Sequence, residues 1–162
     1  MDSFTIKFEF NAHISQVFNA WLDPAKFSIW LGPSGSQMTF LQADVREGGQ
    51  SFWEMIMLDG SKKYGVIHFM NIVRDERLIY KQHFCDATGG FIQAPFSDSY
   101  PAYLMTIVHF TRMEDFSTQI QLTWEVLPDA TAMELDTFQE MKPLMRTGWS
   151  ESFFKLKGLL ES

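Results

Sequence analysis

The chain has 162 residues, a length that favours one domain with a substantial core. Its formal net charge of −7 and the lack of any Lys/Arg cluster argue against nucleic acid and anionic membrane surfaces as partners, because both are bound through basic patches. Aromatic residues reach 15% and there are 10 Met, which is typical either of a loosely specified core or of a surface that adapts to several partners.

The first half of the chain predicts a strand, two short helices and a β-hairpin. Residues 3–10 alternate between apolar and polar side chains, as a half-buried strand does. Ser15 is the expected N-cap of a first short helix, and the Asp-Pro pair that ends this helix begins a second one over 24–29. A second strand is expected over 37–49, where it ends in two glycines, and the hairpin follows over 50–73.

The second half predicts three more strands and one long aperiodic loop. Residues 78–85 form a strand after a tight charged turn, and 102–126 form two strands around a turn at 113–117. Between them, 86–101 shows no periodicity and holds aromatic residues among Gly, Pro, Ser and Asp. A loop of this length inside a compact domain is usually functional or mobile.

The last segment predicts one long helix that covers the sheet. From Thr131 apolar residues recur at steps of three or four, which makes one amphipathic stripe. Pro143 lies inside the stripe and removes a helical hydrogen bond, so we expect a kink or a break near Met141. Strands joined by short turns form an antiparallel meander, whose apolar face needs this helix as a cover. The expected fold class is α+β, with a curved antiparallel sheet of six or seven strands wrapped around the C-terminal helix, as a single domain over 1–162.

The chain also resembles a known family at motifs spread along its length. Residues 14–35 carry a Trp, an Asp-Pro and a Trp-x-Gly-Pro pattern, 44–60 an Arg-x-Gly-Gly strand with an Asp-Gly turn, 65–80 a strand ending in Glu-Arg-Leu, and 148–160 a Gly-Trp helix start. In order and spacing these resemble the helix-grip SRPBCC/START-like superfamily and, within it, homologues of the C-terminal domain of the activator of the heat-shock protein 90 ATPase. The resemblance implies a cavity under the long helix and no fixed chemistry. Superfamily members bind lipids and other hydrophobic ligands, act as cyclases or aromatase-like enzymes, or assist the chaperone's ATPase.

The titratable residues predict no catalytic group, metal site or cofactor. The four histidines and the one cysteine do not stand at metal-ligand spacing. His83 and Cys85 share a strand face that we expect to point outward, as a surface histidine and an inert thiol. His68 is the best candidate for a titratable group inside the fold, either as a hydrogen-bonded core histidine or as an acid/base group.

The hairpin and the helix leave open whether their large apolar side chains fill a core or line a pocket. Composition favours a filled core, whereas the resemblance implies a cavity with a few polar groups. The loop 86–101, with Phe91, Phe96 and Tyr100, would then be its lid or mouth. The candidate ligand-binding residues are Trp30, Trp53, Met55, Met57, His68, Tyr80, Gln82, Trp124, Met141, Met145 and Trp149.

Three functional hypotheses follow. The first is the binding of a small hydrophobic or amphipathic ligand between sheet and helix. The second is a protein-interaction module that activates a chaperone ATPase, against which stands the lack of room for the family's separate chaperone-docking domain. The third is an enzyme that uses His68 on a hydrophobic substrate, without a second catalytic partner in the sequence. The expected partners are a small hydrophobic ligand or, in the second hypothesis, a chaperone or other protein. The single Cys, the missing signal peptide and the lack of an apolar span predict a cytoplasmic protein without membrane insertion.

Overall fold

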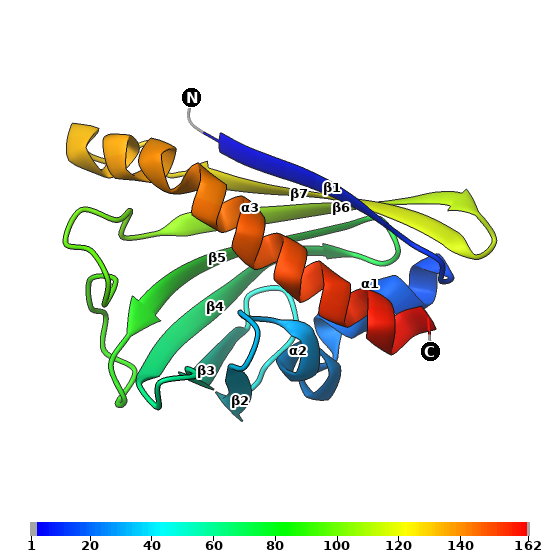
Figure 1. Cartoon of the computed structure of the whole chain (residues 1–162), viewed down its shortest axis with the longest axis horizontal. Helices are drawn as coiled ribbons and strands as arrows, with labels where there is room; N and C mark the ends of the chain where they lie inside the picture. Colours follow the sequence, from blue (N-terminus) through cyan, green and yellow to red (C-terminus); the bar gives the residue numbers. More distant parts are fainter. Residues whose placement is uncertain (1–2, 162) are drawn as a thin grey trace.

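The computed structural model describes residues 3–161 and has an α+β fold in which one long helix crosses a curved sheet (Figure 1). The predicted order of strand, two short helices, six strands and long helix is confirmed. In chain order the elements are β1 (Ser3–Phe10), α1 (Ile14–Leu22), α2 (Pro24–Trp30), β2 (Gln37–Gln42), β3 (Gln50–Ile56), β4 (Lys62–Val73), β5 (Arg77–Cys85), β6 (Leu104–Glu114), β7 (Ser117–Val126) and α3 (Ala132–Glu161).

The sheet has seven strands in the order β1-β7-β6-β5-β4-β3-β2, and every neighbouring pair is antiparallel. All pairs except β1 with β7 are consecutive in the chain, as short connections favour. In the hairpin of β3 and β4, Trp53 lies opposite Gly65. A Cβ at Gly65 would stand 2.2 Å from the Trp53 ring, so this glycine gives the indole its place on the concave face.

The first helix begins two residues earlier than predicted. His13, not Ser15, is the N-cap of α1: its Nδ1 accepts from the Ser15 backbone N–H at 3.1 Å, and the Gln16 side chain accepts from the His13 backbone N–H at 3.2 Å. Ser15 Oγ instead donates to Asp75 Oδ2 at 2.9 Å, which ties α1 to the turn between β4 and β5. The second helix follows the prediction, because the carboxylate of Asp23 caps it and Pro24 stands at its first position.

The long helix continues through Pro143 without a break. Figure 1 shows its first turns at an angle to the rest, and the direction changes in the orange part that contains this proline. Phe138 and Met145, on either side of Pro143, are both buried against the sheet. Of the two predicted alternatives, a kink or a break, the structure has the kink, since tertiary packing keeps both halves helical despite the missing hydrogen bond. None of the helices within 3–161 is long and apolar enough to cross a membrane.

The two halves of α3 pack differently. The C-terminal half lies beside α1 and α2 and closes an aromatic core, in which Phe153 stands 5.3 Å from Phe8 and 5.4 Å from Trp149 between ring centroids. The middle turns of α3, before this core, face β3, β4 and β5 across a space that side chains do not fill.

Candidate functional site

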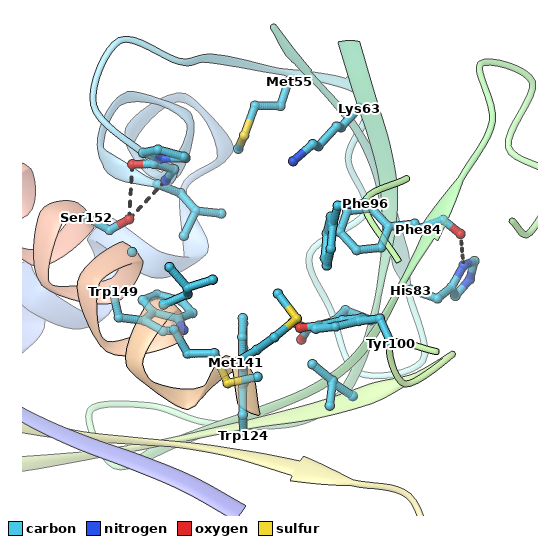
Figure 2. A pocket seen from close by; sticks show the side chains of 18 of the residues that line it. Met55, Lys63, His83, Phe84, Phe96, Tyr100, Trp124, Met141, Trp149 and Ser152 are labelled. Carbon is cyan, nitrogen blue, oxygen red and sulfur yellow. Dashed lines mark hydrogen bonds between the residues drawn. The ribbon is translucent and has the colours of Figure 1, made fainter. Parts of the chain in front are cut away.

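A cavity of about 350 Å³ lies between the concave face of the sheet and the middle turns of α3 (Figure 2). Its wall combines residues of strands β3 to β7, the helix α3, the turn after α2 and the loop between β5 and β6. This volume is within the range of small-molecule sites, and the wall is mostly aromatic, Met and Leu side chains with a few polar groups.

All but two of the predicted ligand-binding residues line this cavity. Strand alternation brings the β3, β5 and β7 residues to one face, and helical spacing brings the α3 residues above them. The lining residues among the candidates are Trp53, Met55, Met57, Tyr80, Gln82, Trp124, Met141, Met145 and Trp149.

Trp30 does not line the cavity. Its ring is fully buried and packs 4.8 Å from Trp21 and 5.1 Å from Phe27, and its Nε1 donates to the Ala20 carbonyl at 3.0 Å. With its polar atom satisfied and its ring enclosed by aromatic neighbours, Trp30 is a core residue that joins α1 to α2.

His68 lies on the opposite face of the sheet from the cavity. Its neighbours Ile67 and Phe69 are buried in the core, while Met70, predicted to share the inward face with His68, is 54% exposed. Apolar residues occupy both phases of β4, so alternation alone does not say which set points inward. The prediction of an inward His68 is wrong, and the hypothesis of an enzyme with His68 in the cavity falls with it.

The outer face instead carries a cluster of His68, His83, Phe91 and Tyr103. The two His Nε2 atoms are 3.2 Å apart, and His83 Nδ1 lies 2.9 Å from the Phe84 carbonyl. Because that carbonyl only accepts, His83 Nδ1 carries the hydrogen, so its Nε2 accepts from His68. His83 is among the residues that line the cavity, but Figure 2 shows its ring turned away from the open space, as the alternation of β5 predicts.

The loop after β5 covers this outer face. Phe91 stacks on Tyr103 with centroids 5.4 Å apart and forms a bridge to Cys85, so it is not part of the cavity mouth as predicted. Phe96 and Tyr100 of the same loop do line the cavity. Cys85 points outward, yet it is buried under the loop instead of lying at the surface, and burial raises its thiol pKa to about 11. The thiol stays protonated at neutral pH and is therefore unreactive.

The histidine pair predicts a loss of stability in mild acid. Burial, and then the charges of His83 and Lys81, lower the pKa of His68 below its ordinary value of 6.5. The unfolded chain then binds more protons than the folded one as the pH falls through 6.5, so the free energy of unfolding drops there. We expect urea unfolding to show a larger drop between pH 7.5 and 5.5 for wild type than for His68→Asn. The exposed His109→Asn is the matched control and should keep the wild-type drop; an equal drop in all three proteins would contradict the assignment.

A buried polar chain stiffens the sheet side of the cavity. Trp124 Nε1 donates to Thr106 Oγ1 at 2.9 Å, and Thr106 Oγ1 donates to Gln82 Oε1. Thr106 is fully buried and was missed by the sequence analysis, although a polar residue between Leu104 and Val108 on the inward phase of β6 could have indicated it. The chain fixes the Trp124 ring and orients the Gln82 amide toward the cavity wall.

At the other end of the cavity, Ser152 connects the turn after α2 to helix α3 by hydrogen bonds. Its Oγ accepts from the Gly32 N–H at 3.0 Å and donates to the Gly32 carbonyl at 3.3 Å, as the dashed lines of Figure 2 show. Gly32 has φ of +106°, and a Cβ there would stand 2.9 Å from the Met55 methyl group. Gly32 thus lets the turn approach both α3 and Met55 and close this wall.

The indole N–H of Trp149 has no hydrogen-bond partner among the described residues, although the residue is only 6% exposed. Its ring stacks on Trp21 with centroids 5.8 Å apart and meets Trp124 edge-on at 5.5 Å. In Figure 2 the nitrogen lies on the side of the ring that faces the cavity, and the Tyr100 hydroxyl points into the same space. Burial raises the pKa of Tyr80 and Tyr100 above the ordinary tyrosine range, so both hydroxyls stay neutral.

Charged groups are scarce around the cavity. Among the described residues that line the cavity, Lys63 carries a positive charge and none is Asp or Glu. Within residues 3–161, no three His, Cys, Asp or Glu side chains come together as a metal site. The arrangement offers hydrogen-bond donors and apolar surface and presents no nucleophile with a neighbouring base.

Solved structures share this fold over nearly the whole chain. A solution structure of a protein from Arthrobacter aurescens is 24% identical, with a TM-score of 0.81 over 98% of this chain and 86% of that one. A crystal structure of protein Ms6760 from Mycobacterium smegmatis is 23% identical, with a TM-score of 0.76 over 98% and 90% of the two chains. The AHSA1 protein from Silicibacter pomeroyi is 19% identical, with a TM-score of 0.72 over 99% and 98%. At these identities the likeness concerns the fold.

The family follows from the sequence. None of the curated proteins compared with the chain matches it significantly. A family model does match residues 11–161, a range that contains all four motifs by which the sequence resembles the family. The chain therefore belongs to the family described as Activator of Hsp90 ATPase homolog 1-like protein.

Proposed function

We propose that this protein binds a small hydrophobic or amphipathic molecule in the cavity between the sheet and α3. The observation that carries the proposal is the open space itself, about 350 Å³ with a wall of Trp, Met, Tyr and Phe side chains. Protein interiors are normally packed to crystal density, so a space of this size needs a reason.

Gly148 supports a pocket against a filled core. It stands in the middle of the helix face that lines the cavity, between Met145 and Ser152. A Cβ added at Gly148 would meet no atom within 4 Å. A large apolar side chain at this position would fill the space, and glycine also lowers helix stability, so the residue favours an empty volume over packing.

The apolar probe N-phenyl-1-naphthylamine tests the proposal. We expect wild type to bind one molecule per chain, and native mass spectrometry of the purified protein to show whether a cellular molecule already occupies the site. Trp149→Ala removes a wall residue and should weaken probe binding about tenfold or more, because roughly 2 kcal/mol of apolar contact is lost. Circular dichroism checks that the sheet is kept; equal affinities in both proteins would remove the cavity as the binding site.

The family match gives a second candidate, the activation of a chaperone ATPase, since its description names an activator of Hsp90. Such an activity would use the outer surface of the domain. The ATPase rate of an Hsp90-type chaperone with and without this protein tests it. A rate increase that persists when the cavity is blocked would assign the function to the surface, and an unchanged rate would remove this candidate.

A further inference from the structure

We infer that the ligand of this cavity is an apolar carboxylic acid, whose carboxylate is held by Lys63 and whose body carries an oxygen that accepts from Trp149. The inference rests on the proposed function and specifies its ligand. Lys63 and Trp149 are contributed by β4 and α3, so a molecule that reaches both lies between sheet and helix.

Lys63 gives the cavity its charge. It is half-buried opposite Met55 in the β3–β4 ladder, its Nζ stands 5.1 Å above the Phe96 ring, and Figure 2 shows the ammonium group directed into the cavity. Its neighbour Lys62 lies 3.8 Å from Glu54, whereas Lys63 forms no ion pair with any residue between 3 and 161. The nearby acidic group is Asp59 in the hairpin turn, whose pKa is lowered by hydrogen bonds from the Ser61 hydroxyl and N–H at 2.6 and 2.9 Å and, to a smaller extent, by the charge of Lys63.

The polar groups at the cavity wall are mainly donors, so they favour acceptors on the ligand, although the Tyr100 hydroxyl can accept as well as donate. The unpaired Trp149 N–H and the Lys63 ammonium can only donate, and the Gln82 amide has its oxygen occupied by Thr106. A buried donor without a partner is unfavourable, so a ligand oxygen at Trp149 removes that penalty.

The charge balance selects a monoanion. No acidic side chain belongs to the described wall, so a cationic ligand would meet Lys63 without compensation. A phosphate dianion would leave one charge unbalanced by the single ammonium group. A carboxylate matches that one charge, and the aromatic and Met wall matches an apolar body.

Three probes separate the two contacts by isothermal titration calorimetry at pH 7.5. They are 6-methoxy-2-naphthylacetic acid, its methyl ester, and the 6-ethyl analogue of the acid. In wild type we expect the acid to bind about tenfold more tightly than the ester, as a charge-assisted contact of about 1.4 kcal/mol gives. The ethyl analogue should bind about fivefold more weakly than the methoxy acid, because it offers no oxygen to Trp149.

Two variants and a matched control complete the test. Lys63→Met keeps the apolar stem and should bring acid and ester to the same affinity, while Lys62→Met, the neighbouring lysine outside the cavity wall, should keep the tenfold preference. Trp149→Phe should remove the difference between the methoxy and ethyl acids. Equal binding of acid and ester by wild type, or a preference that survives in Lys63→Met, overturns the inference.

The outcomes also separate this inference from the proposed function. If N-phenyl-1-naphthylamine binds and neither of the two acids nor the ester does, the cavity binds ligands but its ligand is not an apolar carboxylic acid. If no probe binds and native mass spectrometry finds no bound molecule, the proposed function fails and the inference fails with it.

Discussion

Gly148→Phe is expected to abolish the binding of N-phenyl-1-naphthylamine while leaving the protein at least as stable as wild type. Gly148 lines the cavity from the middle of α3, and nothing lies within 4 Å of the place where its Cβ would be. A phenyl ring built from there enters the space that a ligand would use and packs on the apolar wall. The expected loss of affinity is about a hundredfold or more, since the ring and the probe cannot occupy the same volume.

The stability of this variant distinguishes blocking from misfolding. Phe has a better helix propensity than Gly by a few tenths of a kcal/mol, and burial of its ring contributes up to about 2 kcal/mol. We therefore expect an unchanged or higher free energy of unfolding, measured with urea. Gly158→Phe is the matched control, because Gly158 is in the same helix, also has nothing within 4 Å, and lies outside the cavity wall. Retained probe binding in Gly148→Phe would show that the probe binds elsewhere.

The fold, and the position of nine of the eleven candidate residues at the cavity wall, follow from the sequence for a physical reason. On β3, Trp53 and Met55 share one phase, whereas the other phase carries the charged Glu54 between Phe52 and Ile56, and on α3 the buried residues follow one stripe. Turning β3 over would bury the carboxylate of Glu54, and turning α3 over would expose large apolar side chains to water. The cavity follows from the two patterns facing each other without enough bulk between them.

The incorrect predictions concern segments whose apolar pattern allows two orientations of the element. On β4, apolar residues at consecutive positions surround His68, and a bulge after Phe69 shifts the phase again, so Ile72 packs on the core while Met70 is exposed. Trp30 belongs to a short helix whose face cannot be assigned from seven residues. Lys63 was not among the candidate ligand-binding residues, because no local sequence pattern indicates which face its side chain points to. The direction of this side chain depends on the pairing of Met55 with β4.

The loop after β5 shows a different limit. Its aromatic residues were predicted to act together as a lid or mouth, yet they divide between two faces of the sheet. Phe91 packs outside against Tyr103 and His83, while Phe96 and Tyr100 enclose the cavity with Phe84. An aperiodic segment carries no alternation from which to assign sides, so this division follows only from long-range packing.

The division of α3 into two halves has a direct consequence for stability. Phe153 anchors the helix through aromatic contacts to β1 and α2, whereas Met141, Met145 and Gly148 border the cavity and Trp149 belongs to both regions. Mutations in the anchor should therefore lower the global free energy of unfolding, and mutations along the cavity should mainly change binding.

Phe153→Ala is expected to lower the free energy of unfolding by about 3–5 kcal/mol, because it removes a fully enclosed ring and leaves a space that rigid neighbours cannot fill. Phe153 is 0% exposed, with centroid distances of 5.3 Å to Phe8, 6.1 Å to Phe10 and 5.4 Å to Trp149. In a chain of this size the loss corresponds to a fall in Tm of about 10 °C. Urea unfolding and calorimetry measure both quantities.

Its neighbour supplies the control for this experiment. Phe154 has the same side chain at the next position of α3 and is 65% exposed, although its ring touches Phe8 at a centroid distance of 5.6 Å. Phe154→Ala should change the free energy of unfolding by about 1 kcal/mol or less, since little surface is removed from the core. Similar losses in the two variants would mean that burial against β1 and α2 does not hold the helix. A large loss for Phe153→Ala alone would show that contacts at the C-terminal end of α3 hold the helix over the cavity, which the helix lines from Met141 to Ser152.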